Sequence, residues 1–439
     1  MTHAEADILI IGAGAAGLAA AAELAPTGQR VLLLEARDRI GGRMWTLNAP
    51  DLAVPIEYGA EFIHGEAVPT MAMLRRGGRT AIESTDTHFS LHDGEVAARN
   101  DFFHEVQRAM RVSTELQKQD MSFDDFLAQS KDLSAEVRSS AKSMAEGFDA
   151  ADTRHASARA IAAEWTGEMM NDDAPQSRPQ GGYDALIATL AGSIQSESVH
   201  LQLQTTVRSV RWSQGSVLLD GTFLGKPFRA NARRAIITLP LGVLQQPPNT
   251  PGAVEFSPAL DAKRGALQEL ASGAVIKLML RFKSAFWEEL DGGRYRNAAF
   301  FHAPNSDFRT FWTQLPLRAP LLVAWAGGPK AARLSSSVAP ADIVAQGLST
   351  LQSMFGKRCK VTQAFEGAYY HDWQLDPFAR GAYSYVTVGG AGAPAVLAAP
   401  LADTLFFAGE ATDTEGEMAT VTGALQSGVR AAREILAGL

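Results

Sequence analysis

The first forty-three residues constrain the fold of this chain more than any other segment. An apolar run, Asp7–Ile11, has the composition of a short buried strand, and glycines follow it at G-x-G-x-x-G spacing as Gly12, Gly14 and Gly17. In a strand–turn–helix unit, the first glycine makes the tight turn and the second lets the backbone approach a pyrophosphate. The third lets the helix pack closely on the strand. This spacing therefore predicts a dinucleotide-binding turn.

The segments after the turn complete the unit. An alanine-rich helix runs to Ala25, and a second strand, Val31–Leu34, ends on Glu35. The helix N-terminus offers free N–H groups to phosphates, and an acid roughly twenty residues further on accepts a hydrogen bond from a ribose hydroxyl. Because strand, turn, helix, strand and acid occur in this order, we expect an adenine dinucleotide rather than a glycine-rich loop of another fold.

Composition narrows the class of protein. The chain has 439 residues, of which 46% are hydrophobic and 20% charged, as in a globular protein of two or three domains. The net charge of −8 argues against a nucleic-acid partner and mildly favours a cationic substrate. A generically acidic surface explains the charge equally well.

Cysteine usage and hydropathy indicate a location. Cys359 is the only cysteine, so we expect no internal disulfide and no metal site built on cysteines, which fits a reducing cytosol. The apolar stretch Ile8–Ala22 lacks the preceding Lys or Arg of a signal peptide. No run is long and apolar enough to span a membrane. We expect a cytoplasmic monomer or homodimer without a membrane partner.

The middle of the chain divides into a helical and a strand-rich part. From about Phe102 to Trp165 the pattern is helical and polar, with a helix start at Ser122, which predicts a helical insertion. Strand patterns dominate afterwards, and three of them predict a small meander, at Val207–Trp212, Ser216–Leu219 and Ala235–Leu239. Later helices are expected over Leu260–Leu270 and Ala341–Met354, and strands over Ala274–Phe282, Ala298–Phe301, Arg309–Gln314, Leu321–Ala326 and Thr362–Ala368.

The C-terminal segment repeats the strand–glycine–acid–helix order. A strand, Leu405–Ala408, precedes Gly409 and Glu410, and a final helix covers residues 423–437. Partial positive charge at a helix N-terminus near Thr420 would stabilise a cofactor that becomes anionic when reduced, as a flavin does. An ordinary closing helix is the alternative.

Several segments resemble the flavin-containing amine oxidases. The N-terminal unit, continued from Glu35 to Arg43, is similar to that family's FAD fingerprint. The other similar segments are Glu57–Gly65, Ile236–Leu244, Trp373–Tyr385, Leu405–Thr412 and Ala419–Gly428. Together these motifs are specific, whereas residues 81–175 carry little of the resemblance.

The resemblance implies an FAD site. Val207 resembles the residue whose backbone meets adenine, although its side chain also suits an ordinary core valine, and Glu410 resembles a residue at the ribityl or phosphate region. The cofactor-binding residues that the resemblance implies are Gly12, Gly14, Ala15, Ala16, Gly17, Glu35, Ala36, Arg37, Gly42, Arg43, Gly59, Ala60, Glu61, Phe62, Val207, Trp373, Gly409, Glu410, Thr420 and Val421.

The same motifs resemble the polyamine oxidase and lysine-demethylase branch more than the monoamine oxidases. Monoamine oxidases have a cage of two tyrosines, and only Tyr383 of that pair is present, because Thr420 stands at the other position. They also carry a flavin-linking cysteine where this chain has Ala382. The resemblance therefore implies non-covalent FAD.

Lys277 is the first of four residues to which the resemblance gives a catalytic role. It stands in an apolar strand on the face of Val275 and Met279, where a lysine must pair, snorkel or reach water. The resemblance makes it the lysine that holds a water against flavin N5. An edge-strand lysine that reaches solvent is the alternative.

The other three are aromatic residues and a histidine. Trp373 and Tyr383 resemble a flavin-lining wall that orients an amine by cation–π contact, although core aromatics are the common alternative. His64 resembles a channel histidine that hydrogen-bonds the amine near neutral pH, or it is structural. Glu61 is a weaker candidate for the substrate amine, and the run Asp413–Glu417 is a solvated loop or an acidic rim that attracts polyamines.

These observations predict an α/β flavoprotein of two domains. A discontinuous Rossmann-type FAD-binding domain is expected to comprise residues 1–80, 176–255 and 375–439. An α+β substrate-binding domain, with a mixed or antiparallel sheet and the helical insertion, is expected to comprise residues 81–175 and 256–374.

The resemblance implies that the reaction is oxidation of a primary or secondary amine, from a polyamine or a monoamine. A neutral amine in an aromatic slot transfers a hydride from its α-carbon to flavin N5. Water hydrolyses the imine to an aldehyde or ketone, and O₂ is reduced to H₂O₂.

Three alternatives stay open. An L-amino acid oxidase needs a pocket arginine for the substrate carboxylate, for which Arg178, Arg294 and Arg309 are candidates. An amine dehydrogenase would pass electrons to a protein acceptor. A chromatin demethylase scaffold that acts through protein partners is disfavoured, because no sustained heptad indicates a coiled-coil insertion.

Overall fold

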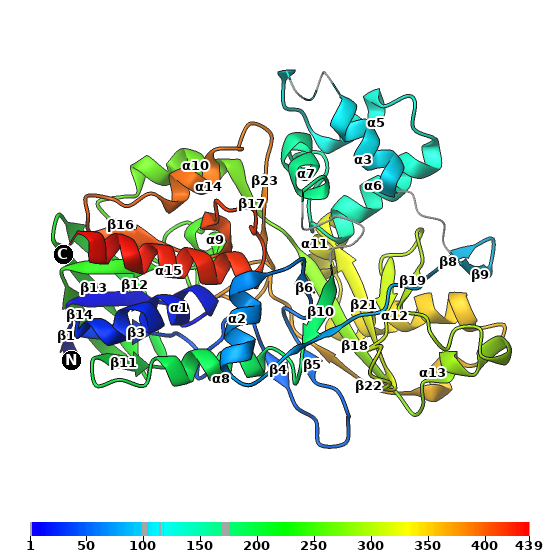
Figure 1. Cartoon of the computed structure of the whole chain (residues 1–439), viewed down its shortest axis with the longest axis horizontal. Coiled ribbons are helices and arrows are strands. Elements are labelled where there is room, and N and C mark those ends of the chain that lie inside the picture. The colour runs from blue at the N-terminus through cyan, green and yellow to red at the C-terminus, as the bar shows by residue number, and fades with distance from the viewer. Residues whose placement is uncertain (1, 99–102, 114–115, 117, 168–174, 439) are drawn as a thin grey trace.

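The computed structural model describes residues 2–98, 103–113, 116, 118–167 and 175–438. Two sheet-containing halves lie side by side along the longest axis of the molecule, with a group of helices over the second half near the junction (Figure 1). The predicted start of the helical insertion at Phe102 falls outside the described residues.

A five-stranded parallel sheet forms the centre of the first half. Its strands, in spatial order, are β11 (Val199–Gln202), β3 (Val31–Leu34), β2 (Ile8–Ile11), β15 (Arg234–Ile237) and β24 (Leu405–Phe407). Each of β2, β3 and β24 is buried along its whole length, because layers cover both faces of the sheet. The N-terminal, middle and C-terminal segments therefore meet in one sheet.

Helices cover one face of this sheet. They are α1 (Ala15–Leu24), α2 (Val68–Arg76), α8 (Asp184–Ser193) and α15 (Val421–Ala437). Small residues let α1 and α15 approach closely, since a Cβ on Gly428 would lie 2.2 Å from the carbonyl oxygen of Ala16.

A second five-stranded sheet covers the other face. Its order is β1 (Thr2–Glu5), β14 (Lys226–Ala232), β13 (Ser216–Phe223), β12 (Thr205–Ser213) and β16 (Glu255–Ser257). The predicted meander is correct for β12 and β13, but its third strand is β14. The run 235–239 belongs instead to β15 of the parallel sheet, where an apolar strand is buried on both faces. The domain division stays a proposal, and the pairing of β16 with β12 favours a boundary after Ser257.

A seven-stranded, mainly antiparallel sheet forms the second half. Its order is β22 (Phe365–Tyr370), β18 (Val275–Phe282), β21 (Leu321–Gly327), β20 (Thr310–Trp312), β19 (Phe300–His302), β8 (His88–His92) and β9 (Glu95–Ala98). Only β19 and β8 pair in parallel within this sheet. The helices of this half are α11 (Gly328–Ser337), α12 (Pro340–Phe355) and α13 (Val361–Ala364).

Two predicted elements differ at their ends. The strand expected over 362–368 begins as the short helix α13, because Val361 is buried with the α12 side chains, and β22 starts only at Phe365. The helix expected over 260–270 is a 3₁₀ turn, Asp261–Lys263, followed by α10 (Arg264–Glu269). Leu270 ends it because this residue starts a strand that pairs elsewhere.

Among the residues that the structure describes, four helices of the insertion pack around a core of their own. They are α3 (Phe103–Val112), α5 (Phe123–Gln129), α6 (Ala135–Gly147) and α7 (Ala158–Trp165). Ser122, Ser134 and Ser157 cap three of these helices by accepting a backbone N–H three residues later, which confirms the predicted start at Ser122.

The remaining described elements are short. They are the strands β4 (Thr46–Leu47), β5 (Ile56–Glu57), β6 (Ile63–His64), β7 (Ala81–Glu83), β10 (Gln176–Pro179), β17 (Leu270–Ser272) and β23 (Ser384–Val386), the helices α9 (Leu241–Leu244) and α14 (Ala393–Ala398), and the 3₁₀ turns Ala25–Thr27, Phe286–Glu288, Leu290–Gly292 and Glu410–Thr412. None of the helices in the described ranges is both long and apolar enough to cross a bilayer.

Candidate active site

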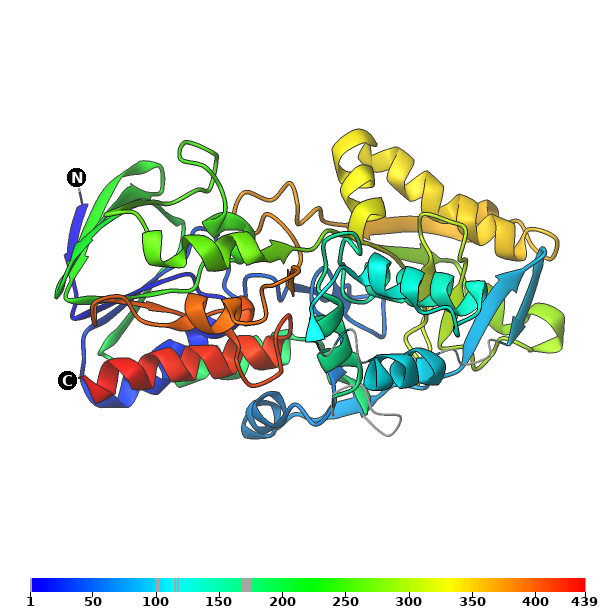
Figure 2. The ribbon, with the colours of Figure 1, turned by 90° about the horizontal axis from the view of Figure 1, so that it is seen from above.

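A cavity of about 2400 Å³ extends from the parallel sheet of the first half to the seven-stranded sheet of the second. Viewed from above, the two halves lie on either side of a junction (Figure 2), and residues of both halves line the cavity. Small-ligand pockets typically measure about 300–1,000 Å³. This cavity therefore has room for a large cofactor and a second, smaller molecule.

The cavity brings the predicted site residues together. All of the predicted cofactor-binding and catalytic residues line it except Gly17. Gly17 instead packs against the turn, since a Cβ there would lie 1.8 Å from the carbonyl oxygen of Gly12. Its predicted role in close helix–strand packing fits this contact, whereas direct contact with the cofactor does not.

The glycine turn lies at the end of β2. Gly12 has φ +108°, which side chains rarely adopt, and its Cα faces Thr238 so closely that a Cβ would lie 2.6 Å from Oγ1. Gly14 precedes α1 without a side-chain cap, so the first N–H groups of the helix lie at the cavity wall, where Ala15 and Ala16 also lie. The turn thus has the open helix end that the sequence predicts.

Glu35 lies at the end of β3 and is 4% exposed. Its Oε2 accepts the N–H of Ala13 at 2.9 Å, and its Oε1 accepts the N–H of Arg37 at 2.9 Å. The guanidinium of Arg37 is paired with Asp376 at 2.7 Å. These contacts fix the carboxylate of Glu35 at the cavity edge between two loops.

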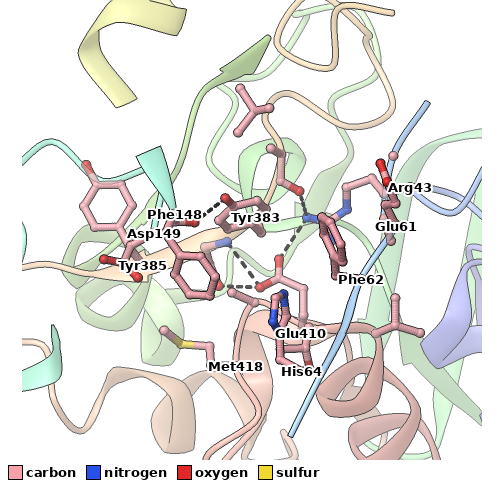
Figure 3. A pocket seen from close by; sticks show the side chains of 18 of the residues that line it. Arg43, Glu61, Phe62, His64, Phe148, Asp149, Tyr383, Tyr385, Glu410 and Met418 are labelled. Atoms are coloured by element: carbon pink, nitrogen blue, oxygen red, sulfur yellow. Dashed lines mark hydrogen bonds and ion pairs between the residues drawn. The ribbon is translucent and has the colours of Figure 1, made fainter. Parts of the chain in front are cut away.

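Arg43 and Glu410 link the two ends of the chain. Nη1 of Arg43 lies 2.9 Å from Oε1 of Glu410 and donates to the carbonyl oxygen of Ala382 at 2.6 Å. The other oxygen of Glu410 accepts the hydroxyl of Ser384 at 2.5 Å (Figure 3). The ion pair therefore fixes the loop before β23 against the N-terminal unit.

The closing helix α15 points its N-terminus at the cavity. Thr420 is its N-cap and accepts the N–H of Gly423 at 3.0 Å, while Val421 begins the helix. Asp413 of the acidic run is 5% exposed and accepts the N–H groups of Glu415 and Glu417. The interpretation of this run as a solvated loop is therefore wrong for Asp413, whose carboxylate orders the turn before the helix.

Lys277 lies on β18 and is 3% exposed. Its Nζ lies 2.8 Å from Oε2 of Glu61 and donates to the carbonyl oxygen of Gly59 at 3.0 Å. Burial alone would raise the pKa of Glu61, but the adjacent Lys277 and Arg178 lower that pKa to about 2. Lys277 is therefore a buried, paired lysine, and the edge-strand alternative is wrong.

Glu61 forms ion pairs with both Arg178 and Lys277. Arg178 donates to Glu61 at 2.8 Å, to Ser84 and to two backbone carbonyls, and Trp312 donates its indole N–H to Glu61 at 2.8 Å. These contacts occupy the Glu61 carboxylate and argue against its suggested role with the substrate amine. They also occupy Arg178, which is thereby unsuited to a substrate carboxylate.

The other two candidates for binding a substrate carboxylate differ in whether they line the cavity. Arg294 is exposed and does not line the cavity. Arg309 lines the cavity and is paired with Glu146 at 2.8 Å. Of the three, Arg309 is the arginine that a substrate carboxylate in the cavity would meet.

Trp373 is 3% exposed and closes the cavity behind Gly59. Its indole N–H donates to the carbonyl oxygen of Tyr58 at 2.9 Å, and its ring lies edge-on to His371 at 4.4 Å between centroids. A Cβ on Gly59 would lie 1.8 Å from the carbonyl oxygen of Arg43, so the close approach of these two backbone segments beside the indole requires a glycine. The tryptophan is fixed in one orientation.

Tyr383 and His64 both contact Phe148. The hydroxyl of Tyr383 donates to the carbonyl oxygen of Phe148 at 2.5 Å, and the His64 ring lies edge-on to the Phe148 ring at 5.3 Å (Figure 3). Burial raises the pKa of Tyr383 and lowers that of His64 to about 4. Both side chains are therefore neutral near pH 7, and His64 can accept a hydrogen bond there.

Many cavity residues from the insertion were not predicted as site residues, and three of them lie near Tyr383. They are Phe148, Asp149 and Glu164. Burial raises the pKa of Asp149 and of Glu164, and the two carboxyl groups lie within hydrogen-bonding reach of each other. In the sequence, Gly147 could have indicated these site residues, because this glycine ends helix α6 directly before Phe148 and Asp149.

A parallel sheet with an open glycine turn, joined by one cavity to a second sheet that supplies a buried lysine, is typical of enzymes that hold a dinucleotide cofactor against a substrate. The sequence model of the family described as flavin containing amine oxidoreductase matches residues 15–172 and 132–436. The chain belongs to this family. Membership of this family assigns FAD as its cofactor.

Similar proteins fall into two groups. Lysine-specific histone demethylase 2 of Homo sapiens is 29% identical over 470 residues, which cover 98% of this chain and 53% of that protein. Lysine-specific histone demethylase 1 homolog 1 of Arabidopsis thaliana is 29% identical over 98% of this chain and 52% of its own length. The chain thus spans about half the length of the curated relatives it matches.

Two solved structures share the fold. A putrescine oxidase bound to putrescine superimposes with a TM-score of 0.82 at 21% identity and covers 99% of this chain and 100% of its own. Cyclohexylamine oxidase from Brevibacterium oxydans IH-35A gives a TM-score of 0.79 at 21% identity, with 99% of each chain covered.

Proposed function

We propose that this chain oxidises a primary or secondary amine, with non-covalent FAD in a Rossmann-type domain and O₂ as the final electron acceptor. The observation that carries this proposal is the continuity of one cavity from the turn at Gly12 and Gly14 to the buried Lys277 and the aromatic ring of Tyr383. We expect a monomer or homodimer in the cytoplasm.

The residues along the first part of the cavity fit FAD. The uncapped N-terminus of α1 suits a pyrophosphate, and Glu35 at the cavity edge suits a ribose hydroxyl. Gly42 has φ +58°, which side chains rarely adopt, and a Cβ there would lie 3.3 Å from the Cα of Gly14, so a glycine at residue 42 helps these two backbones to line the cavity together. Cys359 does not line it, which supports a non-covalent cofactor.

When bound, FAD supplies the acceptor for the hydride of the amine α-carbon, and O₂ then receives the electrons and forms H₂O₂. The N-terminus of α15, capped by Thr420, contributes partial positive charge at the cavity. This field favours a negative charge on whatever group lies there.

Lys277 has one N–H donor without a partner among the residues that the structure describes. An ammonium group carries three N–H donors, and Glu61 and the carbonyl of Gly59 account for two of them. Because Lys277 lines the cavity, we infer that the third donor holds a water molecule at the reacting end. Glu61 acts as the positioning residue for this lysine.

The aromatic side chains bind and orient the amine. Tyr383 stays a neutral phenol because burial raises its pKa, and its hydroxyl is fixed by Phe148. The face of a fixed aromatic ring attracts a nitrogen centre and excludes water. His64, neutral because burial lowers its pKa to about 4, is able to accept a hydrogen bond from the amine.

A second substrate is suggested by the curated relatives. Because these relatives are lysine-specific histone demethylases, an N-methylated lysine side chain is a candidate substrate, and oxidation of such a methylamine is the same chemistry. Oxidation of an L-amino acid would depend on Arg309, which Glu146 already neutralises.

Peroxide release by the holoenzyme tests the proposal. We expect H₂O₂ from monoamines or diamines and little from α-amino acids or an N-methyl-lysine peptide. Peroxide from α-amino acids alone would favour an amino acid oxidase, and the variant Arg309→Leu would then lose activity. Flavin reduction by amines with slow reoxidation in air would favour a dehydrogenase. Inertness to every amine would rule the proposal out.

A further inference from the structure

The cavity wall beside Tyr383 carries two carboxyl groups that the proposed reaction does not use. Asp149 comes two residues after the end of α6, and Glu164 lies in α7. Both line the cavity, and Asp149 is 7% exposed. Figure 3 shows Asp149 with Phe148 and Tyr385 on one side of Tyr383.

Within the described ranges, no cationic side chain is paired with these carboxyl groups. One oxygen of Asp149 lies 3.4 Å from the indole nitrogen of Trp165, which donates to it, while Oδ2 receives no hydrogen bond from the described residues. The ionisable neighbour of Asp149 is Glu164, and no Lys, Arg or His of the described part of the chain is paired with either group. Buried carboxylates are ordinarily paired with a cation, so this pair is incomplete as it stands.

Two carboxyl groups that lie close together in a buried place favour the binding of a cation. Burial and the proximity of the two groups raise the pKa of Asp149, and burial raises that of Glu164, so the pair retains a proton while no cation is near. An ammonium group would restore the ionised carboxylates and supply hydrogen bonds to oxygens such as Oδ2 of Asp149.

The pair lies next to the aromatic wall. The carbonyl oxygen of Phe148 accepts the Tyr383 hydroxyl at 2.5 Å, and Asp149 is the following residue. A molecule whose amine lies against Tyr383 can therefore extend a short aliphatic chain toward Asp149 and Glu164.

We propose that Asp149 and Glu164 form a subsite for a second ammonium group of the substrate, which makes diamines or polyamines the preferred substrates over monoamines. This inference rests on the proposed function. The neutral amine lies at the reacting end, and the ammonium group at the other end of the molecule donates to the carboxylate oxygens of the pair. The aliphatic carbons between them contact the aromatic wall.

The test compares aliphatic diamines with monoamines of equal chain length, by kcat/KM for flavin reduction in the holoenzyme. We expect wild type to favour the diamine by roughly 10- to 100-fold, as for one or two charge-assisted hydrogen bonds. Asp149→Asn and Glu164→Gln should each lower kcat/KM for the diamine toward the monoamine value, with little change for the monoamine. Asp152→Asn is the matched control, because Asp152 pairs with the exposed Arg154 and does not line the cavity.

The outcomes separate the two proposals. Reduction by both amines at equal kcat/KM in wild type would overturn the subsite and leave the proposed function intact. A diamine preference that survives in the Asp149→Asn, Glu164→Gln double variant would overturn it as well. If neither amine reduces the flavin, the proposed function fails and the subsite fails with it. Retention of FAD by each variant shows that it has folded.

Discussion

Lys277 is buried inside an apolar strand, and the neighbours that pair with it explain how. Glu61 and the Gly59 carbonyl satisfy two of its donors, and Glu61 is itself held by Arg178 and Trp312. Leaving one member of such a buried network unpaired costs about 3–5 kcal/mol of folding free energy. The position of Lys277 therefore depends on the positions of its partners.

Replacing Lys277 tests its role at the reacting end. We expect Lys277→Met to slow turnover by roughly 100-fold or more, because the variant loses the donor that holds a water there, while FAD stays bound. Stopped-flow measurement of flavin reduction and reoxidation checks this. Lys283→Met, an exposed lysine just beyond the same strand, is the control and should turn over normally. Near-normal turnover by Lys277→Met would remove the residue from the mechanism.

The carboxyl pair gives a dependence of stability on pH. Because burial raises the pKa of Glu164 above its ordinary 4.5, the folded chain retains a proton that the unfolded chain releases as the pH rises past that value. The free energy of unfolding therefore falls as the pH rises from about 4.5. We expect Glu164→Gln to gain more in Tm over wild type at pH about 8 than at pH about 5. Equal gains at both pH values in thermal unfolding would contradict the raised pKa.

Some residues of the site can be identified from the sequence alone, and others cannot. Lys277 stands out because a charge interrupts an apolar strand, and Gly12, Gly14 and Glu35 stand out by spacing. Phe148, Asp149 and Glu164 do not, since an acid in a polar helical segment is ordinarily solvated. Only the packing of α6 and α7 over the cavity makes them site residues.

At the scale of elements, α1 and the turn before it position the cofactor end of the cavity. The helix packs on β2 and against α15, and both contacts depend on residues without side-chain bulk, namely Gly17 toward the turn and Gly428 toward Ala16. Close packing of this kind tolerates no added methyl group, because backbone atoms on the facing side cannot move away.

A pair of glycine substitutions tests this packing. Gly17→Ala places a Cβ 1.8 Å from the Gly12 carbonyl oxygen, so we expect a loss of about 3 kcal/mol or more and loss of FAD on purification. Gly192→Ala, in α8 with no atom within 4 Å of its Cβ, should stabilise by roughly 0.5–1 kcal/mol. Denaturant unfolding and flavin content measure both. A Gly17→Ala protein as stable as wild type would show that the close approach is not required.

The helices and strands were largely predictable from the sequence, whereas the pairing of strands within the sheets was not. Apolar runs located β2, β3, β15 and β24, and the serine at residue 122 located the start of α5. The run 235–239 was nevertheless assigned to the meander, because a short apolar strand has the same pattern in either sheet. Strand order depends on packing over long distances in the chain, which local periodicity does not encode.

At the scale of the whole molecule, distant segments build one site. The Arg43–Glu410 ion pair joins residues 367 positions apart, and the cavity receives residues from both sheets and from the insertion. The motif resemblance predicted that both termini bind the cofactor. It did not predict the wall formed by the insertion, whose sequence carries little of that resemblance.

The most direct test of the account is an anaerobic titration of the purified chain with an aliphatic amine, followed by the flavin absorbance. The account predicts a yellow protein that releases its FAD on denaturation and bleaches when the amine is added. A colourless protein that takes up no FAD on reconstitution, or a bound flavin that no amine bleaches, would contradict it.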